Sequence, residues 1–317
     1  MKRVLLFVAI AVIPACQQKA PPPIVDMPPI ANMPAVAVAV VFPELGDGQL
    51  LEDGIRVHKL TIPRGRVPMK LWVYLPKPAV PAKPDAKLPV VFIAPAGSPM
   101  MYGLDLADDD AGEHLPYARQ GYVVVAYSLD GHVAKVNQDN DDMFLAAVQA
   151  YKASGAGREN ARTAIDFAMA KLKIDPDRTA IVGHSSAATH SLMVARLDPR
   201  IKACVSYAPC LDVVAWLTPN LAMLESEIPG FRTYIASTSP VAFPTEPKCP
   251  TFLFHAKDDT VVKYSETSKF VAKLGASNPN VQFLSSNTGG HTQSMYDTGI
   301  PAAIEWLDGL FAEKKAK

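Results

Sequence analysis

Short runs of apolar residues alternate with amphipathic segments along most of the chain. Residues 89–94 and 122–126 are continuously apolar, a pattern typical of strands buried on both faces. Apolar side chains between residues 161 and 172 recur at intervals of three and four, which predicts an amphipathic helix. Further strands are predicted at 55–62, 69–75, 179–182, 201–207, 251–255 and 281–284, and further helices at 186–196, 265–274 and 302–311, with another ending near Gln120. Because strands that alternate with helices pair in parallel, the predicted fold class is α/β, with a mostly parallel central sheet and helices on both faces.

The first residues have the pattern of an export signal. Lys2 and Arg3 precede an unbroken apolar run at 4–13, which is too short to span a bilayer but suits the core of a signal peptide. The sequence Ile-Pro-Ala-Cys at 13–16 resembles a bacterial lipobox, in which Cys16 becomes the lipidated first residue of the mature protein. We therefore expect a lipoprotein-type signal peptide at 1–15. The alternative is an ordinary secretory signal that is cut near Ala15.

Residues 16–50 are expected to be the lipidated cysteine and a proline-rich tether. Of the 29 prolines, 17 come before residue 100, and repeated proline among small residues favours extended conformations over a packed core. The Ala-Val alternation at 35–41 is the segment there that predicts an edge strand. Gln17 stands where an aspartate often retains lipoproteins at the inner membrane. The expected location is therefore the outer membrane or periplasm of a bacterium, with membrane contact only through the lipid anchor.

Composition narrows the class of protein. Hydrophobic residues make up 49% of the chain and charged residues 20%, which excludes a wholly disordered chain. We expect one large globular catalytic domain at 51–317. Basic and acidic residues are equal at 31 each, so there is no electrostatic footprint for nucleic acid. Cys204, Cys210 and Cys249 are an odd number in an exported chain, and their places relative to the predicted strands favour free, mostly buried thiols.

About 40 residues separate the strands predicted at 201–207 and 251–255, which is too many for a simple crossover. This segment carries several large apolar residues, including Trp216. We expect a lid-like insertion at about 209–248 over the carboxyl end of the sheet, where open α/β folds bind ligands. A plain surface excursion is the alternative.

A candidate nucleophile follows the strand predicted at 179–182. Gly183-His184-Ser185-Ser186-Ala187 comes directly after that strand and directly opens a helix of small residues. This is the setting of a nucleophile elbow, in which small residues two positions before and after the serine let the two backbones approach. The alternative is that Ser185 or Ser186 only caps the helix.

A serine hydroxyl needs a base to accept its proton and a third group to orient that base. Downstream, the strand predicted at 251–255 runs into Asp258, and Gly289-Gly290-His291 follows the strand predicted at 281–284. The serine, the acid and the histidine therefore come in the order typical of such folds, each after a predicted strand. Asp212, which follows the strand predicted at 201–207, is a less favoured acid.

Together these segments resemble the α/β-hydrolases over about residues 55–313. The resemblance is to the group of dienelactone hydrolases, cutinase-like enzymes and prolyl oligopeptidase catalytic domains. It is carried by IDPDRTAIVGHSSAATHSLMVARLDPRIKACVSYAP, SPVAFPTEPKCPTFLFHAKDDTVV and GGH. It implies an α/β-hydrolase fold in which Ser185 matches the nucleophile, Asp258 the acid and His291 the base. Asp258 rather than Asp259 is matched to the family pattern H-G-x-x-D-x-x-V, with Ala256 in place of the glycine.

An acyl-transfer site also needs donors for the oxyanion that develops on the substrate. One donor is expected from the backbone N–H of Ser186, and the other from Gly97 or Ser98 in the loop after the strand at 89–94. Pro99 has no N–H and cannot serve. An acyl pocket is predicted to be lined by residues that could equally be plain core or surface: Met100, Met101, Tyr102 and Trp216.

No cofactor, metal or nucleotide is expected. No Walker or G-x-G-x-x-G loop follows a strand, and the acidic clusters at 108–110 and 139–142 are interpreted as helix starts rather than calcium sites. The remaining histidines lack metal-ligand spacing and are interpreted as structural or surface residues: His58, His114, His132, His184, His190 and His255.

The sequence therefore predicts an exported serine hydrolase that cleaves a carboxylic ester, either a small molecule or a polymer, through an acyl-enzyme. A serine peptidase of the prolyl oligopeptidase type is the first alternative, although no segment of β-propeller size precedes the first strand of the predicted domain. The second alternative is a catalytically silent binding lipoprotein with the same fold.

Overall fold

The computed structural model describes residues 41–64, 68–78, 86–133 and 140–315. The predicted signal peptide, Cys16 and most of the predicted tether and its edge strand therefore lie outside the described residues. No described helix is long and apolar enough to cross a bilayer.

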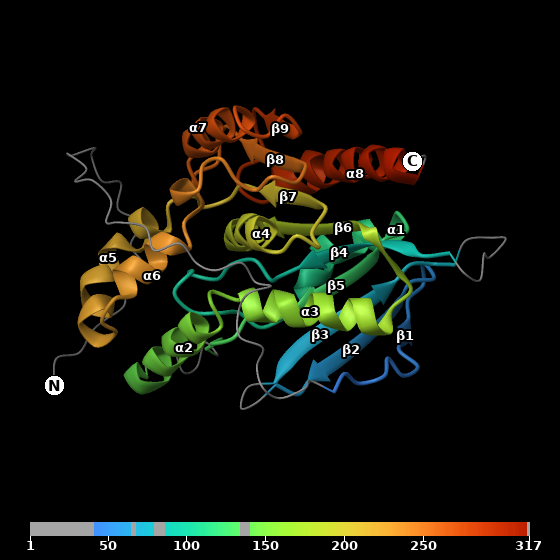
Figure 1. Ribbon diagram of the computed structural model, residues 1–317, viewed down its shortest axis with the longest axis horizontal. Coiled ribbons are helices and arrows are strands. Elements are labelled where there is room, and N and C mark those ends of the chain that lie inside the picture. Colours follow the sequence, from blue (N-terminus) through green and yellow to red (C-terminus); the bar gives the residue numbers. More distant parts are fainter. Residues whose placement is uncertain (1–40, 65–67, 79–85, 134–139, 316–317) are drawn as a thin grey trace.

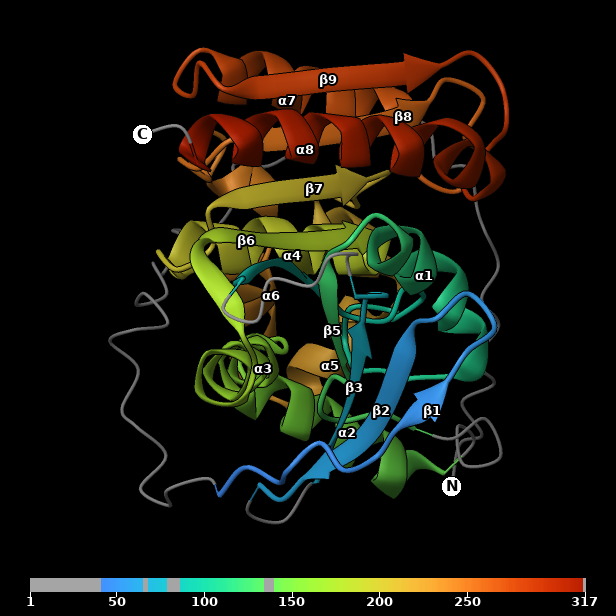
Figure 2. The ribbon, with the colours of Figure 1, turned by 90° about the vertical axis from the view of Figure 1, so that its right-hand side faces the viewer.

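A sheet of nine strands runs through the described part of the chain in the order β1-β2-β3-β5-β4-β6-β7-β8-β9 (Figures 1 and 2). From β5 to β9 all neighbours are parallel, whereas β1, β2 and β3 pair antiparallel at one end. The predicted α/β class with a mostly parallel sheet is thus confirmed. The strands are β1 Gln49–Leu50, β2 Arg56–Ile62, β3 Met69–Leu75, β4 Leu88–Ile93, β5 Val123–Tyr127, β6 Ile174–His184, β7 Ala203–Tyr207, β8 Thr251–Ala256 and β9 Val281–Ser286.

Helices cover both faces of this sheet (Figure 1). One face packs against α3, α4 and α7, and the other against α1 and α8. The central strands β4 and β5 are buried on both sides, which explains their continuous apolar sequences. The helices are α1 Ala111–Arg119, α2 Asp141–Ala153, α3 Arg158–Lys171, α4 Ser186–Leu197, α5 Val213–Glu227, α6 Phe231–Ser237, α7 Tyr264–Gly275 and α8 Ile300–Lys315.

Helix α2 was not among the expected helices. Its start coincides with the acidic cluster at 139–142: Asn140 caps it by accepting a hydrogen bond from the Met143 N–H at 3.0 Å. Asp141 and Asp142 occupy the first turn, where the positive end of the helix dipole stabilises negatively charged carboxylates. The cluster therefore starts a helix, as predicted from the sequence.

The segment between β7 and β8 forms α5 and α6, which lie together at one end of the molecule in Figure 1. Their apolar faces pack on Met100, Met101 and α2 in a separate cluster. The Thr189 hydroxyl of α4 donates to the Cys210 carbonyl at 2.7 Å and ties the start of this insertion to the helix behind Ser185. The insertion is thus a packed, helical part of the domain.

The last residues of the predicted tether pack on the domain. Phe42 contacts Phe167 of α3 edge to face, the Leu45 carbonyl hydrogen-bonds the His58 ring at 2.9 Å, and β1 pairs with β2. Residues in the range 42–50 therefore pack on the domain that was predicted over 51–317. The sequence pattern around this segment, an Ala-Val alternation at 35–41 followed by Pro43, did not predict this packing.

The crossing of β6 and α4 depends on Gly183. A Cβ at this position would lie 2.3 Å from the Ala187 carbonyl oxygen and 2.7 Å from the Ser191 hydroxyl. These are atoms of the facing helix, whose backbone cannot move away without displacing α4. Only glycine therefore permits this approach.

We predict that Gly183→Ala lowers the free energy of unfolding by about 2 kcal/mol or more, because the added methyl overpacks the β6–α4 crossing. Denaturant unfolding of the purified chain measures the loss. Gly309→Ala is the matched control: that glycine is exposed in α8 with nothing within 4 Å of the added methyl, so the control gains about 0.5–1 kcal/mol. Equal unfolding curves for the Gly183→Ala variant and the wild type would contradict the close approach.

Candidate active site

Ser185 occupies a strained turn between β6 and α4. Its φ is 56° and its ψ −120°, outside the regions that non-glycine residues favour. The Ser185 N–H donates to the Tyr207 carbonyl at 2.8 Å, so the turn continues the pairing of β6 with β7. The Ser185 side chain makes no capping hydrogen bond to α4. The turn thus has the geometry of a nucleophile elbow: Ser185 occupies the N-cap position of α4, but its side chain is not used as a cap.

The carboxylate that meets His291 is Asp259, not Asp258. The Nδ1 atom of His291 lies 2.7 Å from Asp259 Oδ2. Asp258 instead accepts hydrogen bonds from the backbone N–H groups of Gly289 and Gly290, at 3.1 and 2.8 Å, and its own side chain is exposed. The two aspartates therefore divide the work: Asp258 holds the loop that carries the histidine, and Asp259 holds the imidazole ring.

The sequence pattern itself indicates Asp259 as the acid. In H-G-x-x-D the aspartate stands four residues after the histidine, and counting from His255 gives Asp259. The physical reason lies in the turn after β8, where Asp259 Oδ1 accepts from the N–H groups of Val261 and Val262 at 2.8 and 3.0 Å. These bonds turn the Asp259 side chain inward, and its exposed fraction is 0%.

Asp259 stays ionised although it is buried. Burial pushes the pKa of this carboxyl upward, but hydrogen bonds from His255, His291 and the Val262 N–H, together with the charge of His291, hold it well below its usual range. The carboxylate accepts its hydrogen bonds from N–H groups: the rings of His255 and His291 and the backbone of Val261 and Val262. A charged acceptor of this kind keeps a proton on His291 Nδ1 and leaves Nε2 free to act as a base.

His184 places His291 beside the elbow. It is the last residue of β6, directly before Ser185, and its ring lies 4.7 Å from the His291 ring, centroid to centroid. The His184 Nε2 donates to the His291 carbonyl at 2.9 Å, and its Nδ1 lies 3.4 Å from a Glu113 carboxylate oxygen of α1. His291 is therefore held against the residue that directly precedes Ser185.

The predicted oxyanion donors are only partly free. The backbone N–H groups of Gly97 and Ser98 both donate to the Ser186 hydroxyl oxygen, at 3.1 and 3.0 Å. This contact pins the loop after β4 to the first residue of α4. The Ser186 N–H lies in the first turn of α4, where N–H groups lack partners within the helix, and it remains the candidate donor. The sequence did not predict that the Ser186 side chain links this loop to the elbow.

The predicted pocket residues separate into two groups. Met100 and Met101 are buried in the cluster beneath α5 and α6, and Tyr102 packs edge to face on Phe144 of α2. Trp216 on α5 has an exposed fraction of 44%. Asp212, the less favoured acid, caps α5 by accepting from the Ala215 N–H at 2.9 Å, whereas the carboxylate on His291 Nδ1 is that of Asp259.

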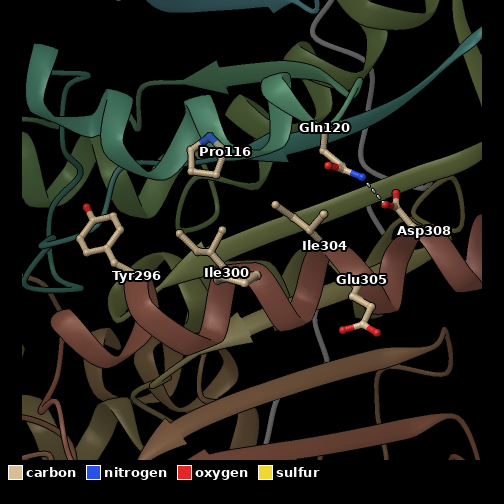
Figure 3. Close-up of a pocket in the computed structure, with 8 residues that line it drawn as sticks. Pro116, Gln120, Tyr296, Ile300, Ile304, Glu305 and Asp308 are labelled. Atoms are coloured by element: carbon tan, nitrogen blue, oxygen red, sulfur yellow. Dashed lines mark hydrogen bonds between the residues drawn. The ribbon is translucent and has the colours of Figure 1, made fainter.

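A hollow of about 590 Å³ forms an open groove between α1 and α8 (Figure 3). Tyr296 and Ile300 line one end, and Gln120 donates to Asp308 at 2.7 Å at the other. None of the candidate catalytic residues lines it. Over the described residues, no cluster of three or more His, Cys, Asp or Glu side chains could hold a metal ion, and the three described cysteines form no disulfide with one another.

Comparison with known proteins assigns the family. The model of the prolyl oligopeptidase family matches residues 113–313. The chain belongs to this family. Membership of this family supports a serine hydrolase, of the esterase or the peptidase kind. The matched residues include Ser185, Asp259 and His291. No curated protein matches the chain.

Solved structures share the fold at low identity. Acylaminoacyl peptidase of Pyrococcus horikoshii is 17% identical with a TM-score of 0.59, covering 82% of this chain but 41% of the other. Acetyl xylan esterase 1 from Thermoanaerobacterium is 15% identical with a TM-score of 0.60, covering 87% and 90%. A Pyrococcus furiosus esterase is 15% identical with a TM-score of 0.53, covering 86% and 95%. The chain thus spans about two fifths of the acylaminoacyl peptidases it matches.

We predict that Asp259→Asn lowers kcat by roughly 10⁴-fold, because an amide neither fixes the His291 tautomer nor stabilises the imidazolium. Asp258→Asn is the matched control one residue away. It keeps an acceptor for the loop and lowers kcat by no more than about tenfold. Steady-state hydrolysis of an activated ester measures both. A larger loss in the Asp258 variant than in the Asp259 variant would return the acid to Asp258.

Proposed function

We propose that this protein is an exported serine hydrolase that cleaves carboxylic esters, with Ser185 as nucleophile, His291 as base and Asp259 as acid. The observation that carries the proposal is the 2.7 Å contact from His291 Nδ1 to the buried Asp259 carboxylate, formed beside the strained Ser185 turn. These groups supply the nucleophile, the base and the orienting acid that acyl transfer needs.

The first half of the reaction acylates Ser185. The Ser185 Oγ attacks the ester carbonyl carbon while His291 Nε2 takes the hydroxyl proton, and Asp259 stabilises the resulting imidazolium. The negative charge on the carbonyl oxygen is met by the Ser186 N–H at the start of α4, where the helix dipole also favours an anion. Collapse of this intermediate breaks the bond to the alcohol, which leaves with the proton from His291.

The second half returns the serine. Water enters in place of the alcohol and gives a proton to His291 Nε2 as its oxygen attacks the acyl carbon. The carboxylic acid then leaves, and His291 returns the proton to Ser185 Oγ. The loop at 97–98 keeps its place through both halves because it is bonded to the Ser186 hydroxyl rather than to substrate.

Two observations favour an ester over a peptide. The chain aligns with the acetyl xylan esterase and the Pyrococcus furiosus esterase over 87% and 86% of its own length and over 90% and 95% of theirs. Its match to the acylaminoacyl peptidases covers 41% of their length. A peptidase remains the second candidate, because the family model that matches residues 113–313 is that of the prolyl oligopeptidases.

The substrate and location follow from separate features. We expect a small-molecule or polymeric ester, acetylated polysaccharide included, and no nucleic acid, since basic and acidic residues are balanced. Export and lipid attachment at Cys16 rest on the signal-peptide pattern of residues 1–16. Radiolabelled palmitate incorporation that disappears in Cys16→Ser would support the anchor.

We predict that the full-length chain in detergent hydrolyses p-nitrophenyl esters faster than aminoacyl-proline or N-acetylaminoacyl anilides. The panel contains acetyl, butyryl and octanoyl esters beside acetylated xylan, and kcat/KM is measured for each. Ser185→Ala, which removes only the nucleophilic oxygen, loses at least about 10³-fold in ester turnover.

Each outcome of this panel decides a different point. Anilide turnover above ester turnover would make the chain a peptidase. Ester turnover that survives in Ser185→Ala would assign the nucleophile elsewhere. Acetyl esters ahead of longer ones would indicate a small acyl pocket.

A further inference from the structure

A second histidine contacts the candidate acid. His255 is the next-to-last residue of β8, and its exposed fraction is 0%. Its Nε2 lies 3.0 Å from Asp259 Oδ2, the same oxygen that meets His291 Nδ1. One carboxylate oxygen therefore lies between two imidazole rings, of which only the His291 ring reaches the elbow.

The contacts of His255 fix its tautomer. Its Nε2 faces the Asp259 carboxylate and the Val262 carbonyl, at 3.0 and 3.1 Å, and both are acceptors. Nε2 must therefore carry a hydrogen. Its Nδ1 lies 2.8 Å from the Thr267 hydroxyl of α7, which is also fully buried and has a hydrogen to donate. Thr267 thus completes a buried hydrogen-bonded chain from α7 through His255 to Asp259.

This arrangement leaves the Asp259 carboxylate no freedom to rotate. Oδ1 accepts hydrogen bonds from two backbone N–H groups of the turn, and Oδ2 accepts hydrogen bonds from the ring nitrogens of His255 and His291. The His255 N–H also places the positive end of a dipole on the oxygen that holds His291. It therefore competes with His291 for the same electron pairs and limits how strongly Asp259 stabilises the imidazolium.

We propose that His255 is a positioning residue for the candidate triad: together with Thr267 it holds Asp259 in the rotation that His291 needs and moderates the basicity of His291. The inference rests on the proposed roles of Ser185, His291 and Asp259. It gives a function to a histidine that was interpreted from the sequence as a structural or surface residue.

The charged and titratable groups around this pair are few. Asp259 comes from the turn after β8, and α7 contributes Glu266 and the Tyr264 ring, which packs edge to face on His255 at 5.9 Å. Burial raises the pKa of Glu266, with Lys263, Lys269 and His255 lowering it and Asp212 raising it. On the far side, His291 meets His184 and, through it, Glu113. Among these groups, only His255 and His291 hydrogen-bond Asp259 Oδ2.

The experiment is a histidine titration of the full-length protein by NMR, with ring nitrogens labelled with ¹⁵N, combined with kcat, KM and the pH dependence of kcat/KM. His255→Leu removes the donor to Asp259. The pKa of His291 then rises by about half a unit, because the competing dipole is gone and the carboxylate binds the imidazolium more tightly. The acid limb of kcat/KM moves by the same amount, and kcat falls about tenfold with KM unchanged, because Asp259 Oδ2 loses one of its two donors and is positioned less exactly.

Conservative variants separate positioning from packing. In His255→Gln the amide nitrogen reaches the place of Nε2 and recovers most of kcat and of the His291 pKa. Thr267→Val keeps the shape but loses the hydroxyl, and moves both quantities in the direction of His255→Leu, whereas Thr267→Ser retains them. His58→Leu is the matched control, since that histidine is buried in β2 far along the sheet order and, among the described residues, its ring hydrogen-bonds only the Leu45 carbonyl. It lowers Tm without moving the His291 pKa.

The proposal is overturned if His255→Leu keeps the wild-type kcat and His291 pKa, or if His255→Gln and His255→Leu lose activity equally with no change in that pKa. If His255→Leu does not fold, the Thr267→Val and Thr267→Ser pair decides the same question. The titration needs no turnover. A wild type that is inert towards the ester panel would therefore count against the proposed function, while the pKa changes would still decide the role of His255.

Discussion

The carboxylate of Asp259 is an ionised group held in the interior at the end of β8, and the geometry of the site depends on how it is stabilised. Burial alone would favour its neutral form. Backbone N–H groups of its own turn and two imidazole rings supply the compensating hydrogen bonds. Because these donors come from the turn after β8, from the end of β8 and from the loop after β9, the carboxylate fixes the positions of three segments relative to one another.

The sheet then delivers this unit to the serine. β6, β7, β8 and β9 are parallel neighbours, so their carboxyl ends share one edge, and Ser185, Asp259 and His291 all follow such ends. Gly183 allows α4 to cross close to β6, and the Ser186 hydroxyl ties the loop after β4 to the same point. Strain at Ser185 is thus supported on both sides by regular structure that cannot relax without breaking these contacts.

Much of this could be predicted from the sequence, because its patterns are local. Continuous apolar runs gave the central strands, and the spacing of small residues around Ser185 gave the elbow. The choice between Asp258 and Asp259 required the count within H-G-x-x-D, since adjacent aspartates are equivalent in composition. The acidic residues at 139–142 indicated a helix start, but the extent of α2 was not predicted, although Phe144, Val148 and Tyr151 recur at helical spacing behind them.

Features that depend on tertiary contacts gave no such signal. Gly97 or Ser98 was predicted to face the oxyanion, yet the N–H groups of both meet the Ser186 hydroxyl, a pairing between residues almost ninety positions apart. His255 resembles any histidine in an apolar strand until β8, α7 and the turn at Asp259 are assembled around it. Backbone donors and shared acceptors of this kind are properties of the folded arrangement rather than of spacing.

The most direct test of the account is to trap the acyl-enzyme. The full-length chain is mixed with an excess of a p-nitrophenyl ester, quenched in acid within milliseconds, and its peptides are mapped by mass spectrometry. The account predicts one acyl group per chain, attached to the peptide that contains Ser185, and none in Ser185→Ala. An acyl group on another residue, or steady ester turnover with no covalent intermediate on Ser185, would contradict it.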